Sequence, residues 1–495
     1  MTTTRLEDIV SLCKRRGFIY QGSDIYGGLS GTWDYGPLGV ELKRNIMQLW
    51  WATFVTDRQD IYGLDSAVLM NPKVWQASGH VNTFSDPMVE DLVTHEMYRA
   101  DHLLKDNNIR SEGLLDHEIT RLLKDNNIKS PKGNDLSSVR QFNMMFKTQV
   151  GPTWMGFEAQ EDAFIANSQI KLKNKHDNNQ LKSFVVPEER QFNGLIAYDI
   201  QSSSYLRPET AQGIFTNFRN IVDSFSPDLP FGIAQQGKAF RNEISPRDFI
   251  FRSREFEQME IEYFVAESNW QESFDMWREL IWQWLGLLGI SRSEVHELEV
   301  PENDRAHYSK RTVDFEFDFP IGREELLGLA YRTDFDLKNI EKFSGKKMLY
   351  IPKDGSKPFL PHVIEPSFGV ERAVMAVLST AYCEDEINGE KRIYLKLPFS
   401  LAPVKIAVSP LLKNKPELVD KAKEVYKDLK NSYQTVIWDD NGNIGKRYRR
   451  QDEIGTPFCV TVDFDSLKDD TVTVRNRDTT EQVRVAISNI NQVIK

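Results

Sequence analysis

The segment Phe240–Phe256, FRNEISPRDFIFRSREF, places four arginines and three carboxylates between aromatic residues. It continues as an alternating run, FEQMEIEYF, over residues 256–264. Successive residues of a strand point to opposite faces of its sheet. The alternation therefore puts Arg241 and Glu243 on one face of a first arm and gives the return arm one polar face and one apolar face. We expect an antiparallel hairpin whose apolar back packs on a core.

The polar face of this hairpin has the chemistry of a nucleotide site. Arginine makes bidentate contacts to phosphate. Phenylalanine offers a flat surface to a base, and a carboxylate accepts a hydrogen bond from an amino group. The alternative is an exposed hairpin whose charges neutralise one another, since exposed ion pairs contribute only about 0–1 kcal/mol each. That alternative accounts for the apolar back but not for a polar face bounded by phenylalanines.

Composition narrows the class of protein. The chain has 495 residues and a net charge of −11, which argues against a non-specific nucleic-acid binder but leaves room for a local basic stripe. Its three cysteines are far apart and form no CxxC pair, so we expect a reducing compartment and no structural zinc. Neither a signal peptide nor an apolar run of the ~18 residues that a membrane span needs is found. These features predict a cytoplasmic protein.

Two further stretches resemble parts of a binding site. Residues 205–215, YLRPETAQGIF, place Arg207 and Glu209 before a helix, with Pro208 suited to its start. Residues 361–378, PHVIEPSFGVERAVMAVL, predict a strand that ends near Glu365, a turn through 367–369 and a helix whose N-terminus would face anions. Taken singly, each stretch is equally well explained as an ordinary helix entry.

The remaining chain divides into two parts. Helical spacing of apolar residues predicts a helix over 38–56, and DSAVLMNP at 65–72 predicts a short strand stopped by Pro72. Strands dominate from 230 to 264, and a Trp-rich helix follows over 268–288. From 398 onward, strands and helices alternate in the manner of a separate small α/β domain. We therefore expect domains at 1–397 and 398–495.

Two segments of the first domain stand apart from this pattern. The heptapeptide LLKDNNI occurs at 103–109 and again at 122–128, within a polar segment of about 101–140 that is expected to be helical in pieces. Two copies are too few for a solenoid, so we interpret them as two helix ends stopped by Asn pairs. Residues 170–184, IKLKNKHDNNQLKSF, are expected to form a basic loop.

Together these blocks resemble the class II aminoacyl-tRNA synthetases, and among them the glycyl-tRNA synthetases of the homodimeric kind. The hairpin is similar to motif 2 of that family, EPSFGVERAVMAVL to motif 3, and residues 38–72 to motif 1, which forms the family's dimer interface. GFIYQGSDIYGGLSGTWDYGPLGVELKRN (17–45) resembles its N-terminal signature. The resemblance implies an α+β fold: a catalytic antiparallel sheet flanked by helices, plus a C-terminal α/β anticodon-binding domain.

The same resemblance implies ATP-dependent attachment of glycine to tRNA(Gly) through a glycyl adenylate, with Arg241, Glu243 and Arg372 as catalytic residues. In that family pattern Arg241 binds the α-phosphate, Glu243 accepts from the adenine amino group, and Phe256 stacks on the base. Arg372 reaches the γ-phosphate and covers the adenine, and Glu325 acts through Mg²⁺. The ATP-binding residues carried over are Arg241, Asn242, Glu243, Phe251, Arg252, Ser253, Arg254, Glu255, Phe256, Glu325, Leu326, Gly369, Val370, Glu371 and Arg372.

A glycine site is implied beside the ATP site. Carboxylates suit the ammonium group of glycine, and a cation such as Arg99 suits its carboxylate. Ser367 or a neighbouring carboxylate is expected to fill the space that a larger side chain would need. The glycine-binding residues carried over are Arg99, Glu209, Phe256, Glu257, Gln258, Met259, Glu260, Glu365, Pro366, Ser367, Phe368 and Gly369.

The implied partners are tRNA(Gly), glycine, ATP and a second copy of the chain. Lys446, Arg447, Arg449 and Arg450 form the densest basic cluster of the C-terminal domain, for which either anticodon contact or a solvated helix face remains open. Some family members carry a Cys-rich element before FNMMFKT, but the corresponding stretch here, KSPKGNDLSS, has none, so no zinc is carried over.

Other functions remain to be weighed against this one. A catalytically silent accessory subunit would be expected to lack some of Arg241, Glu243, Glu209 and Arg372, and all four are present. A class II enzyme for serine, threonine or proline would be expected to have other pocket residues than the three carboxylates Glu209, Glu260 and Glu365. Dinucleoside polyphosphate synthesis would be a side activity of the same adenylate.

Overall fold

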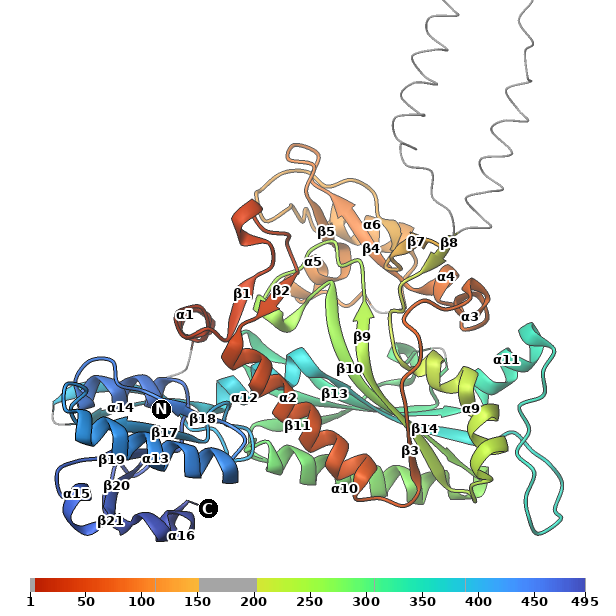
Figure 1. Cartoon of the computed structure of the whole chain (residues 1–495). Helices are drawn as coiled ribbons and strands as arrows, with labels where there is room; N and C mark the ends of the chain where they lie inside the picture. The colour runs from red at the N-terminus through yellow and green to blue at the C-terminus, as the bar shows by residue number, and fades with distance from the viewer. Residues whose placement is uncertain (1–4, 112, 151–202, 307, 388, 495) are drawn as a thin grey trace, which may run out of the picture.

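A seven-stranded sheet forms the centre of the chain in the computed structural model, which describes residues 5–111, 113–150, 203–306, 308–387 and 389–494 (Figure 1). The strand order is β11-β12-β13-β14-β10-β9-β3, and every neighbouring pair is antiparallel except β3 with β9. The strands are β3 (Ile61–Leu64), β9 (Phe231–Phe240), β10 (Glu255–Val265), β11 (Val295–Glu299), β12 (Arg311–Phe319), β13 (Gly322–Thr333) and β14 (His362–Gly369). The predicted antiparallel catalytic sheet is confirmed.

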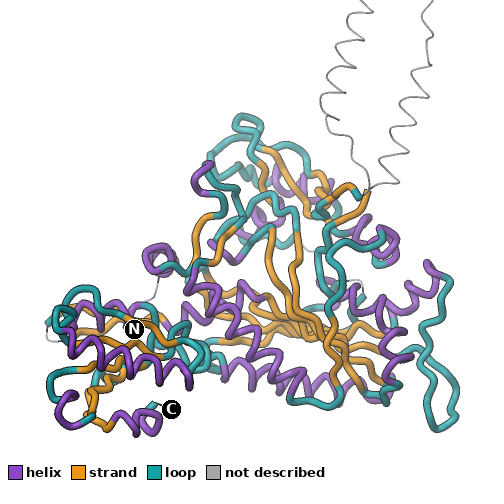
Figure 2. Tube along the Cα trace, in the orientation of Figure 1, coloured by secondary structure: helices purple, strands orange, loops and turns teal. Residues whose placement is uncertain are grey.

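Helices cover both faces of this sheet (Figure 2). One face carries α1 (Leu6–Arg16), α2 (Pro37–Trp51), α10 (Trp270–Leu287) and α12 (Val370–Ala381), and the other carries α9 (Ala211–Phe225) and α11 (Phe335–Ser344). The apolar residues of β10 behave as the alternation predicts, because Met259, Ile261 and Tyr263 all join the first of these cores. Phe264 faces the second core, under α9.

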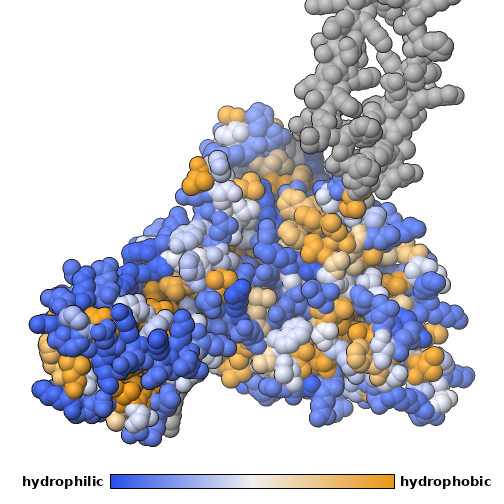
Figure 3. All heavy atoms as spheres, in the orientation of Figure 1, coloured by the Kyte–Doolittle hydropathy of each residue, from blue (hydrophilic) through white to orange (hydrophobic). Residues whose placement is uncertain are grey.

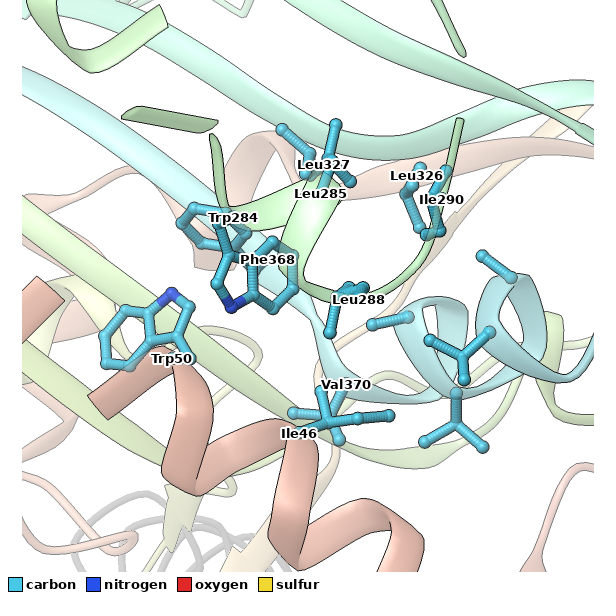
Figure 4. Close-up of a cluster of buried hydrophobic side chains, with 14 of the residues drawn as sticks. Ile46, Trp50, Trp284, Leu285, Leu288, Ile290, Leu326, Leu327, Phe368 and Val370 are labelled. Carbon is cyan, nitrogen blue, oxygen red and sulfur yellow. The ribbon is translucent and has the colours of Figure 1, made fainter. Parts of the chain in front are cut away.

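Aromatic side chains fill the larger core (Figure 4). Phe368 lies with its ring centre 5.9 Å from Trp50 and 5.0 Å from Trp284, so its side chain packs on both α2 and α10 on this face of the sheet. Edge-to-face aromatic pairs of this kind contribute about 0.5–1.5 kcal/mol beyond the area that they bury. The predicted helix over 38–56 is confirmed, and its last turn, Ala52–Thr56, is a π-helix.

Smaller elements surround the sheet. The N-terminal ones are β1 (Ile19–Gln21), η1 (Asp24–Tyr26) and β2 (Trp33–Tyr35), followed later by α3 (Pro72–Ala77) and α4 (His80–Thr83). A three-stranded sheet of β4 (Ser85–Glu90), β5 (Met97–Arg99) and β6 (Arg140–Asn143) carries α5 (Ala100–Asp106) and α6 (Asp116–Asp125). The pair β7 (Lys147–Gln149) and β8 (Ser203–Tyr205) completes this region, and the 3-10 turns η4 (Phe249–Phe251), η5 (Glu267–Asn269) and η6 (Glu302–Asp304) lie nearer the sheet.

The duplicated heptapeptide ends two helices, as predicted. Asn107 and Asn126 are the C-caps of α5 and α6, and the following residues, Asn108 and Asn127, have φ values of 58° and 50°. Asparagine tolerates this left-handed conformation better than most residues, so the same sequence stops both helices in the same way. The proposed basic loop, 170–184, lies outside the described residues.

Three local predictions are wrong. Residues 65–72 are not a strand, because the strand of this region is β3 and Pro72 instead begins α3, whose N-terminus Asn71 caps. Pro208 does not begin α9, whose N-cap is Thr210. Residues 367–369 are not a turn, because β14 continues through Gly369 while it pairs with β10 and β13, and α12 follows at once.

The C-terminal part forms a second sheet with its own core. The sheet order is β18-β17-β19-β20-β21, with β17 (Ile406–Pro410), β18 (Val436–Trp438), β19 (Phe458–Val462), β20 (Thr471–Asn476) and β21 (Gln482–Ala486). Its helices are α13 (Pro416–Ser432), α14 (Ile444–Glu453), α15 (Ser466–Asp469), the 3-10 turn η7 (Ile487–Asn489) and α16 (Ile490–Val493). A hairpin of β15 (Tyr382–Ile387) and β16 (Glu390–Leu395) precedes it, and α14 contacts β16. The surface of this part is mainly hydrophilic on the side seen in Figure 3.

Candidate active site

A cavity of about 520 Å³ opens over the polar face of β10. Seventeen of the predicted ATP and glycine residues border it. They are Arg99, Glu209, Arg241, Glu243, Phe251, Arg252, Ser253, Phe256, Gln258, Glu260, Glu325, Leu326, Glu365, Ser367, Gly369, Glu371 and Arg372. Residues from segments more than 250 positions apart in the chain therefore meet at one site.

Eight predicted site residues do not border the cavity. Met259, Phe368 and Val370 are buried in the core on the far side of the sheet, as the alternation along β10 and β14 requires. Of the other five, Glu255 pairs with Lys238 at the edge of the hairpin, and Glu257 pairs with Lys43 of α2. These five are Asn242, Arg254, Glu255, Glu257 and Pro366.

The predicted hairpin is present, but its first arm ends three residues earlier than the alternation predicted. β9 stops at Phe240, so Arg241 and Glu243 lie in the loop rather than on a strand face. The loop is held by Arg254, whose side chain donates to the carbonyl oxygens of Glu243, at 2.8 Å, and Ser30, at 3.0 Å. Gly31 has φ 74°, and a Cβ there would lie 2.6 Å from Pro246. The N-terminal segment around Gly31 therefore packs directly against this loop.

The arginine and aromatic side chains of the cavity lie together. The guanidinium of Arg241 is 5.2 Å from the ring centre of Phe256 and donates to the carbonyl oxygen of Pro208. Arg372 lies over Phe251 at 4.6 Å and forms an ion pair of 2.9 Å with Glu325. The cavity thus offers two guanidinium groups beside two flat aromatic surfaces.

Carboxylates gather at the other end of the cavity. Glu260 accepts hydrogen bonds from the backbone N–H of Thr210 at 2.9 Å, and from the Ser367 hydroxyl at 2.7 Å. Glu209 forms an ion pair of 3.2 Å with His80, and the nearby positive charge holds the pKa of Glu209 at about 2, against the effect of burial. A cationic group entering here would meet oriented carboxyl groups, among them the ionised Glu209.

The sequence analysis did not identify Arg332 as part of this group. Its guanidinium is 1% exposed and donates to Glu365 at 2.7 Å and twice to Asp336 at 2.9 Å. Asp336 also accepts from Gln212 of α9. The only local signal was the spacing of Arg332 and Asp336 by four residues, whereas the contact with Glu365 depends on the pairing of β13 with β14.

Arg99 borders the cavity but already has two partners. Its guanidinium donates to Asp86 at 2.9 Å and to Asp101 at 2.6 and 3.1 Å. Burial raises the pKa of Asp86 to about 6, while the charge of Arg99 opposes that rise. Asp86 and Asp101, like His80, were not singled out from the sequence.

Carboxyl groups around the cavity make stability depend on pH. Burial raises the pKa of Asp314 and Glu371 to about 7 and of Glu365 to about 8. A carboxyl group whose pKa rises on folding binds its proton more tightly in the folded state, so its contribution to stability is lost as the pH rises through the folded value. Burial lowers the pKa of His102 to about 4. This group therefore makes the free energy of unfolding increase as the pH rises, but only below about pH 6.5.

We therefore expect the free energy of unfolding of the unliganded chain to fall by about 2–3 kcal/mol between pH 6.5 and 8. Urea unfolding at several pH values in this window measures it. The matched variant Glu365→Gln, which cannot titrate, should lose more than half of the slope. A stability that stays level or rises across the window in the unmodified chain would contradict these assignments.

The four basic residues predicted to contact tRNA do not form one exposed cluster. Arg447 is 2% exposed, and its guanidinium donates to backbone carbonyl oxygens, among them those of Gly442 and Asp440. Arg450 is half-buried and pairs with Asp439, whereas Lys446 and Arg449 are exposed on α14. Arg447 therefore holds the start of α14 in place and is not available at the surface.

Two properties of the described residues concern metals and membranes. Among the residues that the structure describes, no group of three or more His, Cys, Asp or Glu side chains is arranged to hold a metal ion. No helix within the described ranges combines the length and the apolar character needed to cross a bilayer.

Comparison with known proteins agrees with the geometry of this cavity. Residues 196–381 match the family described as tRNA synthetase class II core domain (G, H, P, S and T), and residues 405–495 match the anticodon binding domain. The chain is 42% identical to the glycine–tRNA ligase of Caldanaerobacter subterraneus subsp. tengcongensis, covering 99% of this chain and 98% of that one. It is 44% identical to the glycine–tRNA ligase of Thermus thermophilus, covering 100% and 99% of the two chains.

A solved structure shares the fold at much lower identity. Prolyl-tRNA synthetase from Cryptosporidium parvum superposes with a TM-score of 0.59 and 14% identity, over 99% of this chain and 75% of that one. At this identity the likeness supports the class II fold alone, which agrees with the predicted fold class.

Proposed function

Because the chain belongs to the glycine–tRNA ligase family of class II aminoacyl-tRNA synthetases, we propose that the cavity over β10 is the site where ATP activates glycine. The chain attaches glycine to tRNA(Gly) at the expense of ATP, and its C-terminal part is an anticodon-binding domain. The observation that carries the site assignment is the convergence of three carboxylates, Glu209, Glu260 and Glu365, beside Arg241 in one cavity.

In this assignment the two ends of the cavity take different parts of the substrates. Phe256 and Arg372 bind the adenine between them, and Glu243 accepts from its amino group. Arg241 binds the α-phosphate, and Arg252 lies in the loop that follows the triphosphate, while Arg254 holds that loop in place. The carboxylate of glycine, held by Arg99, attacks the α-phosphorus, and pyrophosphate leaves as glycyl adenylate, a mixed carboxylic–phosphoric anhydride, forms. The 3′-hydroxyl of tRNA then attacks the glycyl carbonyl, and AMP leaves.

No protein nucleophile is required by this scheme, so catalysis rests on positioning and on charge stabilisation. Correct placement of two reactants can supply about 7–11 kcal/mol. Charge-assisted donors aimed at the developing negative charge add to this. Glu209, Glu260 and Glu365 bind the ammonium group of glycine, which fixes the direction of its carboxylate. The hydrogen bond from Ser367 to Glu260 supports the exclusion of larger amino acids, because it puts a side chain and its partner where a substrate side chain would have to lie.

Mg²⁺ fits the phosphate end of the cavity. The carboxylates of Asp314 and Glu325 both come within 4 Å of the position that a Cβ on Gly328 would take, at 3.6 and 3.8 Å. Mg²⁺ is bound in many nucleotide sites by one or two carboxylates together with substrate phosphates. Asp314 and Glu325 would hold it, and it would supply charge neutralisation on the leaving pyrophosphate.

We extend the proposal to domain limits, assembly and compartment. The separate core of residues such as Ile406, Val460 and Val474 supports a second domain, and the packing of Leu401 and Val404 in the larger core favours a boundary a few residues after 398. Ile25 and Tyr26 are each 88% exposed, which supports a homodimer formed through the N-terminal block and motif 1. Sedimentation at micromolar concentration should give twice the 57.3 kDa of one chain. The three free cysteines support a cytoplasmic location.

Charging of a tRNA(Gly) transcript with labelled glycine tests the function. We expect ATP-dependent, acid-precipitable label that is absent when a tRNA for another amino acid is supplied. Charging of the second tRNA at a comparable rate would overturn the assignment of the tRNA, and charging with another amino acid would overturn the assignment of glycine.

Anticodon contact by α14 gives a separate prediction. The double variant Lys446→Ala/Arg449→Ala should raise the KM for tRNA by about 5- to 30-fold, because two phosphate-binding charges are lost. It should leave glycine-dependent exchange without tRNA unchanged. Lys468→Ala, which removes an exposed lysine elsewhere in the same domain, is the matched control. An unchanged KM for tRNA in the double variant would assign these two side chains to a solvated helix face.

A further inference from the structure

Glu262 is a buried carboxyl group that the reaction scheme does not use. It lies two residues after Glu260 on the same face of β10, and it is 0% exposed. Neither of its two carboxyl oxygens has a hydrogen-bond partner among the described residues. Most buried polar side chains in proteins are hydrogen-bonded, so this group calls for an explanation.

The neighbours of Glu262 are mostly other carboxyl groups. The charges of Glu365 on β14, Glu260 on β10 and Asp336 on α11 all favour the neutral form of Glu262. Arg332 on β13 is the cation that favours its ionised form. On β9, Ile233 lies opposite Glu262 in register. From α9, which packs on β10, Gln212 donates to Glu209 and Asp336 and not to Glu262.

The charge of Arg332 is already shared. Its guanidinium donates to Asp336 and Glu365, and none of its hydrogen bonds goes to Glu262. If Glu262 were ionised, four carboxylates would face this one guanidinium in the interior. An ionised group transferred to an apolar interior costs many kcal/mol unless it is paired, and such groups become neutral instead. Burial first, and then the charge of Glu365, raise the pKa of Glu262 well above its ordinary value.

We propose that Glu262 is a positioning residue of the glycine pocket: it remains a neutral carboxylic acid beneath Glu260 and Glu365, and its dipole supports the ionised form of Glu365 when the ammonium group of glycine binds. This inference rests on the proposed assignment of Glu365 to that ammonium group. Glu365 is then the member of the cluster that releases its proton to solvent on glycine binding, while Glu262 keeps its own. The carboxylic acid of Glu262 acts through Glu365 and does not itself touch glycine.

Two substitutions test whether the side chain of Glu262 acts as a neutral polar group, as a charge, or only by filling space. Glu262→Gln keeps a neutral polar group of the same size, and its KM for glycine at pH 7 should stay within about threefold of the unmodified chain. Glu262→Met removes the polar group, and its KM for glycine should rise about tenfold at pH 7 and recover as the pH rises through about 8, where Glu365 ionises without help. The KM for ATP should change in neither variant.

The protonation state can be observed directly by infrared spectroscopy. The difference spectrum between the unmodified chain and Glu262→Gln at pH 7 should show the C=O band of a protonated carboxyl group that the variant lacks. A carboxylate band in its place would overturn the proposal. So would a Glu262→Met chain that is folded, by near-ultraviolet circular dichroism, and has an unchanged KM for glycine at pH 7.

The proposed function and the inference on Glu262 can fail separately. The infrared band reports on Glu262 alone, whereas glycine-dependent exchange by the unmodified chain reports on the proposed function. If the band is present but glycine does not support exchange, the assignment of the site fails; if exchange is present but the band is absent, the inference on Glu262 fails.

Discussion

Replacing Arg241 with alanine is expected to lower glycine-dependent exchange of pyrophosphate into ATP by about 10²- to 10³-fold, the usual loss when one preorganised donor to a developing charge is removed. Arg241 borders the cavity, and among the described residues its side chain makes one hydrogen bond, to the carbonyl oxygen of Pro208. Most of its capacity as a donor is therefore left for a substrate. The loss should appear mainly in kcat, because charge on the α-phosphate grows toward the transition state.

A matched control lies in the same loop. Arg247 is more than half exposed, pairs with Asp248 and does not border the cavity. Arg247→Ala should keep exchange within about threefold of the unmodified chain, since exposed ion pairs contribute about 0–1 kcal/mol. Equal losses in both variants would mean that the loop, and not the guanidinium of Arg241, is what matters.

Replacing Arg332 with glutamine is expected to lower the free energy of unfolding by about 3–5 kcal/mol, because it removes one partner of a buried ion pair and leaves carboxylates unopposed. Asp336 and Glu365 both lose their cation in this variant. Urea unfolding at pH 7 measures the change. Activity should fall as well, since in the proposed glycine site Glu365 would lack the hydrogen bond from Arg332 that holds its carboxyl group.

The control for Arg332 is Arg323 on the same strand. It is 50% exposed and pairs with Asp318, so Arg323→Gln should change stability by less than about 1 kcal/mol. Adding Asp336→Asn to Arg332→Gln should restore part of the lost stability, because the carboxyl group that made two hydrogen bonds with Arg332 is removed. Equal stability of the Arg332 and Arg323 variants would show that the buried ion pair is not the source of the effect.

The sequence predicts those features that depend on local pattern. The alternation along β10 correctly separates the core residues Met259, Ile261 and Tyr263 from the polar residues that face the cavity. The helix over 38–56 and the two Asn-terminated helices follow from apolar spacing and capping chemistry.

Features that depend on long-range pairing could not be found in this way. The contact between Arg332 and Glu365 exists because β13 and β14 are neighbours, and His80 reaches Glu209 across 129 positions of the chain. β14 continues through Ser367 and Gly369 because ladders on both sides hold it extended, which overrides the turn tendency of these small residues. On α14, the sequence shows a dense basic cluster but not which of its faces is buried, so Arg447 was counted with the surface.

The most direct test of the account is exchange of labelled pyrophosphate into ATP by the purified chain with Mg²⁺ and no tRNA, comparing glycine, alanine and serine. The cavity assigned here should support exchange with glycine and exclude alanine and serine by at least about 10²-fold, because in the proposed pocket the hydrogen-bonded pair of Ser367 and Glu260 leaves no space for a substrate side chain. Exchange with alanine or serine at a rate close to that with glycine would contradict the assignment of the pocket. Exchange with none of the three, in folded protein, would contradict the central claim that this cavity activates an amino acid.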